Sequence, residues 1–389
     1  YGFILSSRVG HLIGNMDTYL CYKSQGLQDD DLYKKYKTIH IFYCQEDVCN
    51  KEILNKLKKR VIILPRFLLH WVEQFDVFLD KFIKSKRIHE IGCYDDVSGK
   101  LSFKSNKVPY IERDFNGYYN NIQNFYLGEK DLDIGNSIFK ELGINSEKKI
   151  ICINARDTEY LNQIYPDNDW SRHDYRTFDI EYFNETIKYL IRNNYFVIRA
   201  GSIAAKESTI IDENFLDYPF CNFKSDLLDL YIAHKCSLLI STSSGLDNIY
   251  SSFRKPILWP SLFPIKDIRS SSDSYMASFR HLEREDKTKL TFKEVLNLNL
   301  DYCYNSSLLK KNNLFLSKPN SIDIMETTKD MLNHLNHNYE FSDKEENLKN
   351  KFFEIFENSN YFNNFQRFHK KINFKVSKYF LNQNEWWLS

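Results

Sequence analysis

The chain has 389 residues, more than the length at which a single hydrophobic core usually stops growing, so we expect more than one domain. Its 53 basic and 52 acidic side chains leave a net charge of +1, which gives no overall field for holding nucleic acid. Hydrophobic residues make up 42% of the chain, which excludes general disorder. No apolar run approaches the roughly 20 residues of a membrane span. We expect a cytoplasmic protein, with contact at the inner face of the membrane left open.

The first part of the chain alternates short apolar strands with helical stretches. This alternation predicts βαβ units and a mostly parallel sheet, which is an α/β fold. From about residue 88 to 128 the pattern weakens, and we place a domain boundary at residue 145. The predicted strands cover residues 2–6, 38–44 and 61–64, and the predicted helices cover residues 12–22, 51–59 and 67–83.

The pattern becomes sharper after residue 149 and predicts a second α/β domain. Its predicted strands cover residues 150–154, 195–200, 237–240 and 256–259, and its predicted helices cover residues 179–193, 227–234 and 246–253. Helical spacing of apolar residues near the end of the chain predicts helices that pack back on the body. The predicted domains are therefore residues 1–145, residues 146–325 and a helical tail of residues 326–389.

The loop after the first strand is the first candidate for chemistry. In an open α/β sheet, ligands bind at the carboxyl ends of the strands, where this loop lies. Gly10 lets the backbone approach a ligand, Arg8 offers an anion contact, and His11 could act as a general base. The alternative is an ordinary turn with a solvated arginine and a capping histidine.

Charged residues also follow the first strand of the second domain. Arg156 could form bidentate hydrogen bonds to phosphate oxygens, and Asp157 could orient it or act as a base; a surface ion pair is the alternative. Downstream, the run of residues 169–176 contains Asp174 and Arg176 beside aromatic residues, which indicates either a partly enclosed site or a solvated face. The Asp-Asn-Asp sequence at residues 167–169 could hold a metal, but turn residues are favoured, so no metal is expected.

Small hydroxyl residues and glycine between a buried strand and a helix give the strongest local signal. Such a turn presents backbone N–H groups at a positive helix end, where a phosphate can bind, although serine and threonine are also ordinary helix caps. The turn consists of Ser241, Thr242, Ser243, Ser244 and Gly245. At the start of the preceding helix, Ser225 is a cap candidate, and Asp226 either caps the helix or contacts a ribose or base.

These motifs together resemble a family of bacterial glycosyltransferases found with surface-polysaccharide genes. The resemblance rests on residues 8–12, 154–157, 173–176, 225–226 and 241–246 and on Val197-Ile198-Arg199-Ala200-Gly201. It implies a GT-B architecture, in which two Rossmann-like domains face each other across a cleft. It also implies a nucleotide-sugar donor held mainly by the second domain, an acceptor on the side of the first domain, and no metal or other cofactor.

A more distant likeness, to protein and nodulation fucosyltransferases, implies individual roles. Arg156 would hold the β-phosphate, and Ser243, Ser244 and Gly245 would cradle the pyrophosphate. Donor binding would extend over the remaining candidates, which are Arg8, Gly10, Arg176, Arg199, Gly201, Ser225, Asp226, Ser241 and Thr242.

Two functions remain open from the sequence. The first is a glycosyltransferase that transfers a sugar to a glycan or lipid-linked acceptor in bacterial surface-polysaccharide synthesis. Its catalytic base would be His11 or Asp157, with Asp174 as the third candidate. The second is a catalytically inactive nucleotide-binding scaffold of the same fold that acts in a glycan assembly complex.

Overall fold

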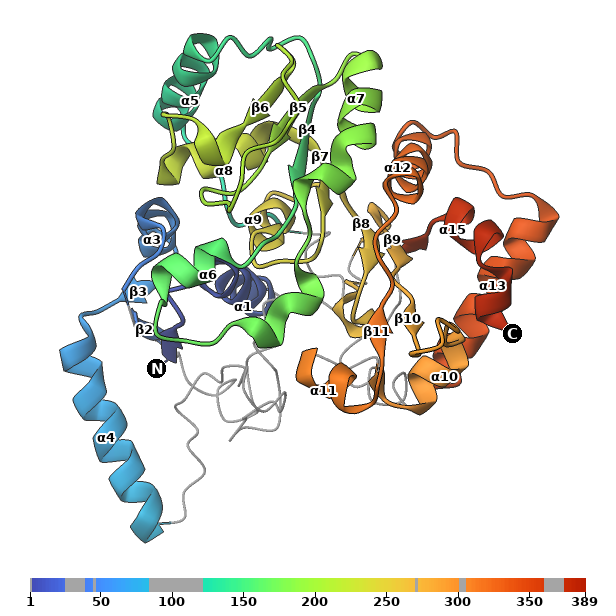
Figure 1. The fold of residues 1–389 in the computed structure, drawn as a ribbon. Helices are drawn as coiled ribbons and strands as arrows, with labels where there is room; N and C mark the ends of the chain where they lie inside the picture. Colours follow the sequence, from blue (N-terminus) through green and yellow to red (C-terminus); the bar gives the residue numbers. More distant parts are fainter. Residues whose placement is uncertain are drawn as a thin grey trace.

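The computed structural model describes residues 2–24, 39–44, 47–83, 122–269, 272–300, 306–359 and 374–389. Two parallel sheets of different size organise these residues, as Figure 1 shows. A small antiparallel pair, β10 (Leu282–Glu283) and β11 (Phe315–Leu316), lies beside the larger sheet. The predicted α/β class with two parallel-sheet units is confirmed by this topology.

The smaller sheet belongs to the N-terminal unit and contains β1 (Gly2–Ile4), β2 (Ile41–Cys44) and β3 (Ile62–Ile63) in the order β1-β2-β3. Its helices are α1 (Met16–Ser24), α3 (Lys51–Lys58) and α4 (Arg66–Ile83). The predicted strands and helices of this unit are confirmed. One local difference is that the first helix starts with a π-helical turn, η1 (His11–Asn15), before α1 begins. Most of the stretch where the sequence pattern weakens, residues 88–121, lies outside the described residues.

The larger sheet has seven parallel strands in the order β12-β9-β8-β7-β4-β5-β6. Four of them match the predicted strands: β4 (Ile150–Asn154), β5 (Phe196–Arg199), β7 (Cys236–Ser241) and β8 (Ile257–Leu262). The other three were not predicted: β6 (Phe215–Asp217), β9 (Tyr275–Phe279) and β12 (Lys375–Val376). Two of these are too short to show a period, and the sheet therefore extends beyond the predicted core on both sides.

Helices cover both faces of the larger sheet, and β4 shows why. Because side chains alternate along a strand, Ile151 and Ile153 enter one hydrophobic cluster while Ile150 and Cys152 enter the other. The first cluster is closed by α7 (Asn184–Arg192) and α12 (Ser321–Leu335). On the other face lie α8 (Asp226–Lys235) and α9 (Asp247–Ser252), and α5 (Glu129–Glu141) packs against α8.

The C-terminal segment returns to the body and contributes the edge strand β12 to the sheet. Its helices α13 (Asp343–Glu357) and α15 (Lys378–Gln383) and the final turn η8 (Glu385–Leu388) pack on each other. The short helix α10 (Phe292–Asn297) faces them, and Phe292 stacks on Phe352 and on Trp387 with ring centroids 4.9 and 4.5 Å apart. Stacked aromatic rings therefore fix the tail. The two predicted boundaries between the three domains remain predictions.

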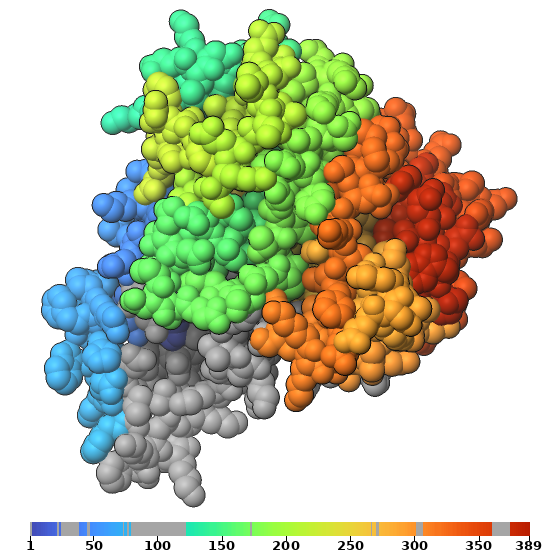
Figure 2. Space-filling view, viewed as in Figure 1, coloured from blue at the N-terminus to red at the C-terminus, as the bar shows by residue number. Residues whose placement is uncertain are grey.

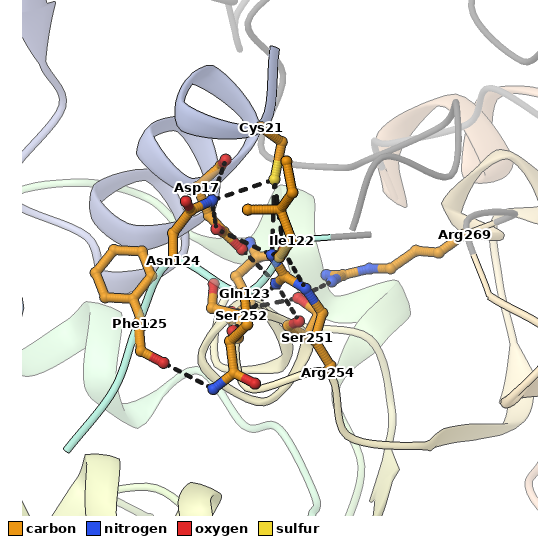
Figure 3. Close-up of polar contacts among 11 residues, drawn as sticks. Asp17, Cys21, Ile122, Gln123, Asn124, Phe125, Ser251, Ser252, Arg254 and Arg269 are labelled. Atoms are coloured by element: carbon orange, nitrogen blue, oxygen red, sulfur yellow. Dashed lines mark hydrogen bonds and ion pairs between the residues drawn. The ribbon is translucent and has the colours of Figure 1, made fainter. Parts of the chain in front are cut away.

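The two units are joined by polar contacts between α1 and the end of α9, drawn in Figure 3. Asp17 is fully buried and accepts from Nη1 of Arg254 at 2.6 Å. Asn124 Nδ2 donates to the same carboxylate at 2.8 Å, and Arg254 also donates to the carbonyl of Ile122. A single hydrophobic cluster also runs through both units. Along this face the units form a packed interface, not an open cleft.

Candidate active site

Three loops that the sequence analysis singled out meet at the junction of the units. They follow β1, β4 and β7. Gly10 lies so close to the turn after β7 that a Cβ added to it would be 2.5 Å from the Cα of Gly245. Asn248 Nδ2 donates to the carbonyl of Gly10 at 3.2 Å, and the backbone N–H of Arg156 donates to Thr242 Oγ1 at 3.0 Å. The structure thus brings Gly10, Arg156 and Gly245 to one place.

Arg156 stands out because its guanidinium is almost enclosed and has no acidic partner among the described residues. The backbone is held on both sides, since its carbonyl accepts from the N–H of Phe178 at 2.9 Å. Among the described residues, nothing accepts a hydrogen bond from its buried Nη1 atom. Burial, and after it the positive charge of Arg176, lowers the pKa of Arg156 to about 9.

Arg176 ends the 3-10 helix η3 (Ser171–Arg176) and adds a second cation beside Arg156. Its guanidinium lies over the ring of Tyr175, with 5.3 Å between the guanidinium carbon and the ring centroid. Nη2 lies 3.3 Å from Nδ1 of His173, and Nε is buried without a hydrogen-bond partner in the described part of the chain. Two like charges are therefore held together, with a donor atom of each unused.

The carboxylates near this pair do not neutralise it directly. Asp157 accepts from the backbone N–H groups of Glu159 at 3.0 Å and Ala205 at 2.9 Å, and its nearest ion-pair partner is Arg199 at 4.0 Å. Asp174 is exposed to solvent. The charges of both carboxylates oppose the lowering of the Arg156 pKa, but neither makes a hydrogen bond to it. The catalytic roles of both residues remain predictions.

Arg199, at the end of β5, behaves differently from Arg156 although the two strands are neighbours. It is 2% exposed, and its Nη1 donates to the carbonyl of Lys206 at 2.7 Å and pairs with Asp217 at 3.3 Å. Its charge is therefore balanced within the protein. Gly201 follows with a φ of 105°, a conformation that favours glycine, so its evident role is to turn the chain.

The hydroxyl groups of the turn after β7 bond within the protein. Ser241 Oγ donates to Asp247 Oδ1 at 2.6 Å, and Ser243 Oγ donates to Asp267 Oδ2 at 3.0 Å. The side chain of Ser244 accepts from the N–H of Leu246 at 3.1 Å. These contacts show that the hydroxyl groups hold the loop in its shape. Binding of a phosphate by this turn remains a prediction.

Sequence reasoning missed the buried acids Asp247 and Asp267. Asp247 is fully buried and also accepts from Nε1 of Trp259 at 2.8 Å, while Asp267 is 1% exposed. Asp247 stands two residues after Gly245 and begins α9, so an acid directly after an uncharged turn was a usable signal. Asp267 is 24 residues away from Ser243, and no local sequence pattern indicated it.

Ser225 and Asp226 lie at the start of α8. Ser225 Oγ accepts from the N–H of Leu228 at 3.1 Å, so the capping interpretation of Ser225 is confirmed. Asp226 Oδ2 accepts from the backbone N–H of Lys51 at 2.7 Å, and Asn50 Nδ2 donates to the carbonyl of Asp226 at 3.2 Å. The pair thus joins α8 to the start of α3, and its predicted contact with a nucleotide remains a prediction.

A small pocket opens where the two units meet, and both contribute to its wall. Its volume is about 150 Å³, and it is lined by Leu5, Ser7, Arg8, His11, Tyr165, Asn168 and Trp170. Typical sites for whole small-molecule ligands enclose roughly 300 to 1,000 Å³, so this one fits a fragment such as one sugar ring. Of the run 169–176, Trp170 lines this pocket, and the enclosed site predicted for that run stays a prediction, whereas Tyr165 was not predicted as a wall residue.

The segment 165–176 connects this pocket to the arginine pair. The Trp170 ring stacks on His173 with ring centroids 5.9 Å apart, and His173 lies against Arg176. In Figure 2 the green surface of this part of the chain covers the N-terminal unit. Asp169 accepts from the N–H of Ser171 at 2.9 Å, so the turn interpretation of residues 167–169 is confirmed. No group of three potential metal-ligating side chains occurs within the described ranges.

Comparisons with known proteins give a limited result. No protein-family model matches the chain, and no curated protein does. A solved structure of the E. coli ADP-heptose LPS heptosyltransferase II is similar at 14% identity, with a TM-score of 0.39, and covers 72% of this chain and 89% of that one. A glycosyl transferase family 9 structure from Veillonella parvula DSM 2008 is similar at 11% identity, with a TM-score of 0.38, and covers 72% and 85%. Both TM-scores are below 0.5, so neither likeness supports a conclusion about function.

Proposed function

We propose that this protein is a GT-B glycosyltransferase that transfers a sugar from a nucleotide-activated donor to a glycan or lipid-linked acceptor in bacterial surface-polysaccharide synthesis. The observation that carries the proposal is the half-buried pair Arg156 and Arg176, each with a buried nitrogen that lacks a hydrogen-bond partner in the described part of the chain. Holding two like charges together in a partly buried place is costly unless a counter-charge arrives. A ligand with adjacent negative charges supplies it.

A diphosphate matches this pair in charge and in hydrogen-bonding chemistry. Guanidinium groups form paired, charge-assisted hydrogen bonds to phosphate oxygens, and a nearly enclosed site strengthens them. When a glycosyl bond to a nucleotide breaks, negative charge grows on the departing diphosphate. Donors already in position stabilise that charge without rearranging, so Arg156 and Arg176 favour the transition state over the bound substrate.

The pocket between the units would hold the reacting groups. His11, on the N-terminal side, is 8% exposed and lines this pocket together with Arg8. An imidazole there could accept the proton of the acceptor hydroxyl as that oxygen attacks the anomeric carbon. Of the three predicted bases, His11 is the one that lines the pocket, whereas Asp157 is bound to backbone N–H groups and Asp174 faces solvent. We therefore assign the base role to His11.

Nucleotide binding and turnover test the proposal. Thermal unfolding would be followed with UDP, GDP, ADP and CMP, and donor hydrolysis and transfer would then be measured with the sugar nucleotides of any base that stabilises the protein. We expect one nucleotide to raise the unfolding temperature, with the effect lost in Arg156→Met and kept in Arg192→Met, an exposed arginine on α7. Binding with no turnover in the presence of acceptor extracts would support the scaffold function instead. No binding of any nucleotide would contradict both.

A further inference from the structure

Helix α4 has an apolar face that points away from the protein. At about 100° per residue, the spacing of its apolar residues defines one arc of roughly 140°. The residues on this arc that the structure describes are between 48% and 74% exposed: Phe67, Leu68, Trp71, Val72, Phe75 and Phe78. Leu69, on the other side of the helix, is 6% exposed. In Figure 1, α4 extends away from the two sheets.

This orientation is the reverse of the usual one. A surface helix normally turns its apolar stripe to the core, and a large exposed apolar patch marks a surface that another body covers. Here α4 contacts β2, and Leu69, which lies off the aromatic arc, is buried.

Basic residues lie at the end of the helix where the apolar arc begins. Lys58, Lys59 and Arg60, at the end of α3, are exposed, and Arg66 is the first residue of α4. Ile62, between them, is 48% exposed. Exposed cations beside an aromatic arc are the pattern of a helix that lies in the interface of an anionic bilayer.

We propose that α4 is a membrane-surface anchor, which inserts its aromatic arc among the headgroups of an anionic lipid bilayer while the neighbouring lysines and arginines contact the lipid phosphates. None of the described helices is long and apolar enough to cross a membrane, so the contact is to one face. The exposed cations beside the arc select lipid as the occupant, because anionic headgroups supply the counter-charge that Lys58, Lys59 and Arg60 lack among the described residues of this face. This anchor does not depend on glycosyl transfer.

Vesicle binding without substrate tests the anchor. Wild-type protein would be sedimented with vesicles of phosphatidylcholine containing phosphatidylglycerol, and with vesicles of phosphatidylcholine alone. We expect binding to the anionic vesicles, weakened roughly tenfold or more in Trp71→Ser/Phe75→Ser because two large apolar groups are lost. A matched control, Ile211→Ser/Ile322→Ser, removes two exposed apolar residues elsewhere and should bind like wild type. Lys58→Glu/Lys59→Glu should abolish the preference for anionic lipid.

The outcomes separate the possible occupants of this face. Insertion would also shift the Trp71 fluorescence to the blue, a signal that Trp71→Phe would remove. Equal vesicle binding by wild type and the Trp71→Ser/Phe75→Ser variant would overturn the proposal. The proposal would also be overturned if the folded wild type does not bind the vesicles. A dimer of wild type in sedimentation velocity, with the Trp71→Ser/Phe75→Ser variant a monomer, would overturn it too.

Discussion

Arg254 and Arg156 are both largely enclosed arginines near the junction of the units, yet their surroundings differ. Arg254 pairs with the fully buried Asp17 at 2.6 Å and donates to backbone carbonyls around it. Within the described ranges no carboxylate contacts Arg156, and its strongest neighbouring charge is a second arginine. A cation balanced by its own chain is part of the fold. A cation kept without such a balance is positioned for the charge of a ligand.

The largest effect is expected when the balanced arginine is removed. Arg254→Met leaves the carboxylate of Asp17 buried without its cation, which should lower the free energy of unfolding by about 3 to 5 kcal/mol. Chemical denaturation would measure the loss. Asp17→Leu/Arg254→Met removes both charges and should recover much of it. If Arg254→Met alone is as stable as wild type, this contact does not hold the units together.

The same substitution at Arg156 should affect activity while leaving stability intact. Arg156→Met removes a buried charge that has no partner, so the free energy of unfolding should stay level or rise. If the proposed function is correct, kcat/KM should fall roughly 30- to 1,000-fold, which corresponds to a loss of roughly 2 to 4 kcal/mol of transition-state stabilisation. Arg192→Met is the matched exposed control. A stability loss as large as that of Arg254→Met would remove the contrast between the two arginines.

His281 shows a third way of enclosing a basic group, because its ring is kept neutral. It stacks on Phe380, and Nε2 lies 2.8 Å from Oδ1 of Asn384. Burial lowers its pKa from 6.5 to about 4, so the unfolded chain binds a proton that the folded one does not. Its contribution to stability is therefore full above pH 6.5 and should be lost as the pH falls toward 4, by roughly 3 kcal/mol.

Denaturation at several pH values would check this dependence. His281→Gln cannot take up a proton in this range, so its stability should change less between pH 6.5 and pH 4 than that of wild type. Identical slopes for the two proteins would contradict the assignment of the effect to His281.

The smallest effect concerns the contact between the two glycines beside Arg156. A Cβ on Gly10 would lie 2.5 Å from the Cα of Gly245, so Gly10→Ala must push the loop after β1 away from the turn after β7. We expect a loss of about 1 to 3 kcal/mol in unfolding free energy. Gly128→Ala is the control, because its nearest contact would be an ordinary 3.9 Å. If the two variants are equally stable, the contact between Gly10 and Gly245 is not tight.

Hydrophobic periodicity was sufficient for the elements whose pattern is long or clear. The strands around Cys152 and Leu239 are continuous apolar runs because both faces of the sheet are covered, and such runs are visible in sequence. The strand Lys375–Val376 is two residues long and pairs with β9, far away in the chain. Tertiary contacts define a strand of that length, and no local pattern does.

The positions of the candidate site residues could be predicted from the sequence, but their hydrogen-bond and ion-pair partners could not. The rule that loops meet at the carboxyl ends of parallel strands placed Arg156 beside the turn after β7, as observed. The family resemblance placed Arg199 in the site, but its partner Asp217 comes from the neighbouring strand β6, which was not predicted. Whether a buried arginine is balanced depends on residues far away in the sequence, and only the folded structure shows them.

The most direct measurement is a crystal structure with UDP, GDP, ADP or CMP bound. The central claim is that Arg156 and Arg176 form the diphosphate site. It predicts phosphate oxygens within hydrogen-bond distance, about 2.7 to 3.2 Å, of Nη1 of Arg156 and Nε of Arg176, the two buried nitrogens without partners among the described residues. Phosphates bound elsewhere, with both guanidiniums unchanged and still unpaired, would contradict it.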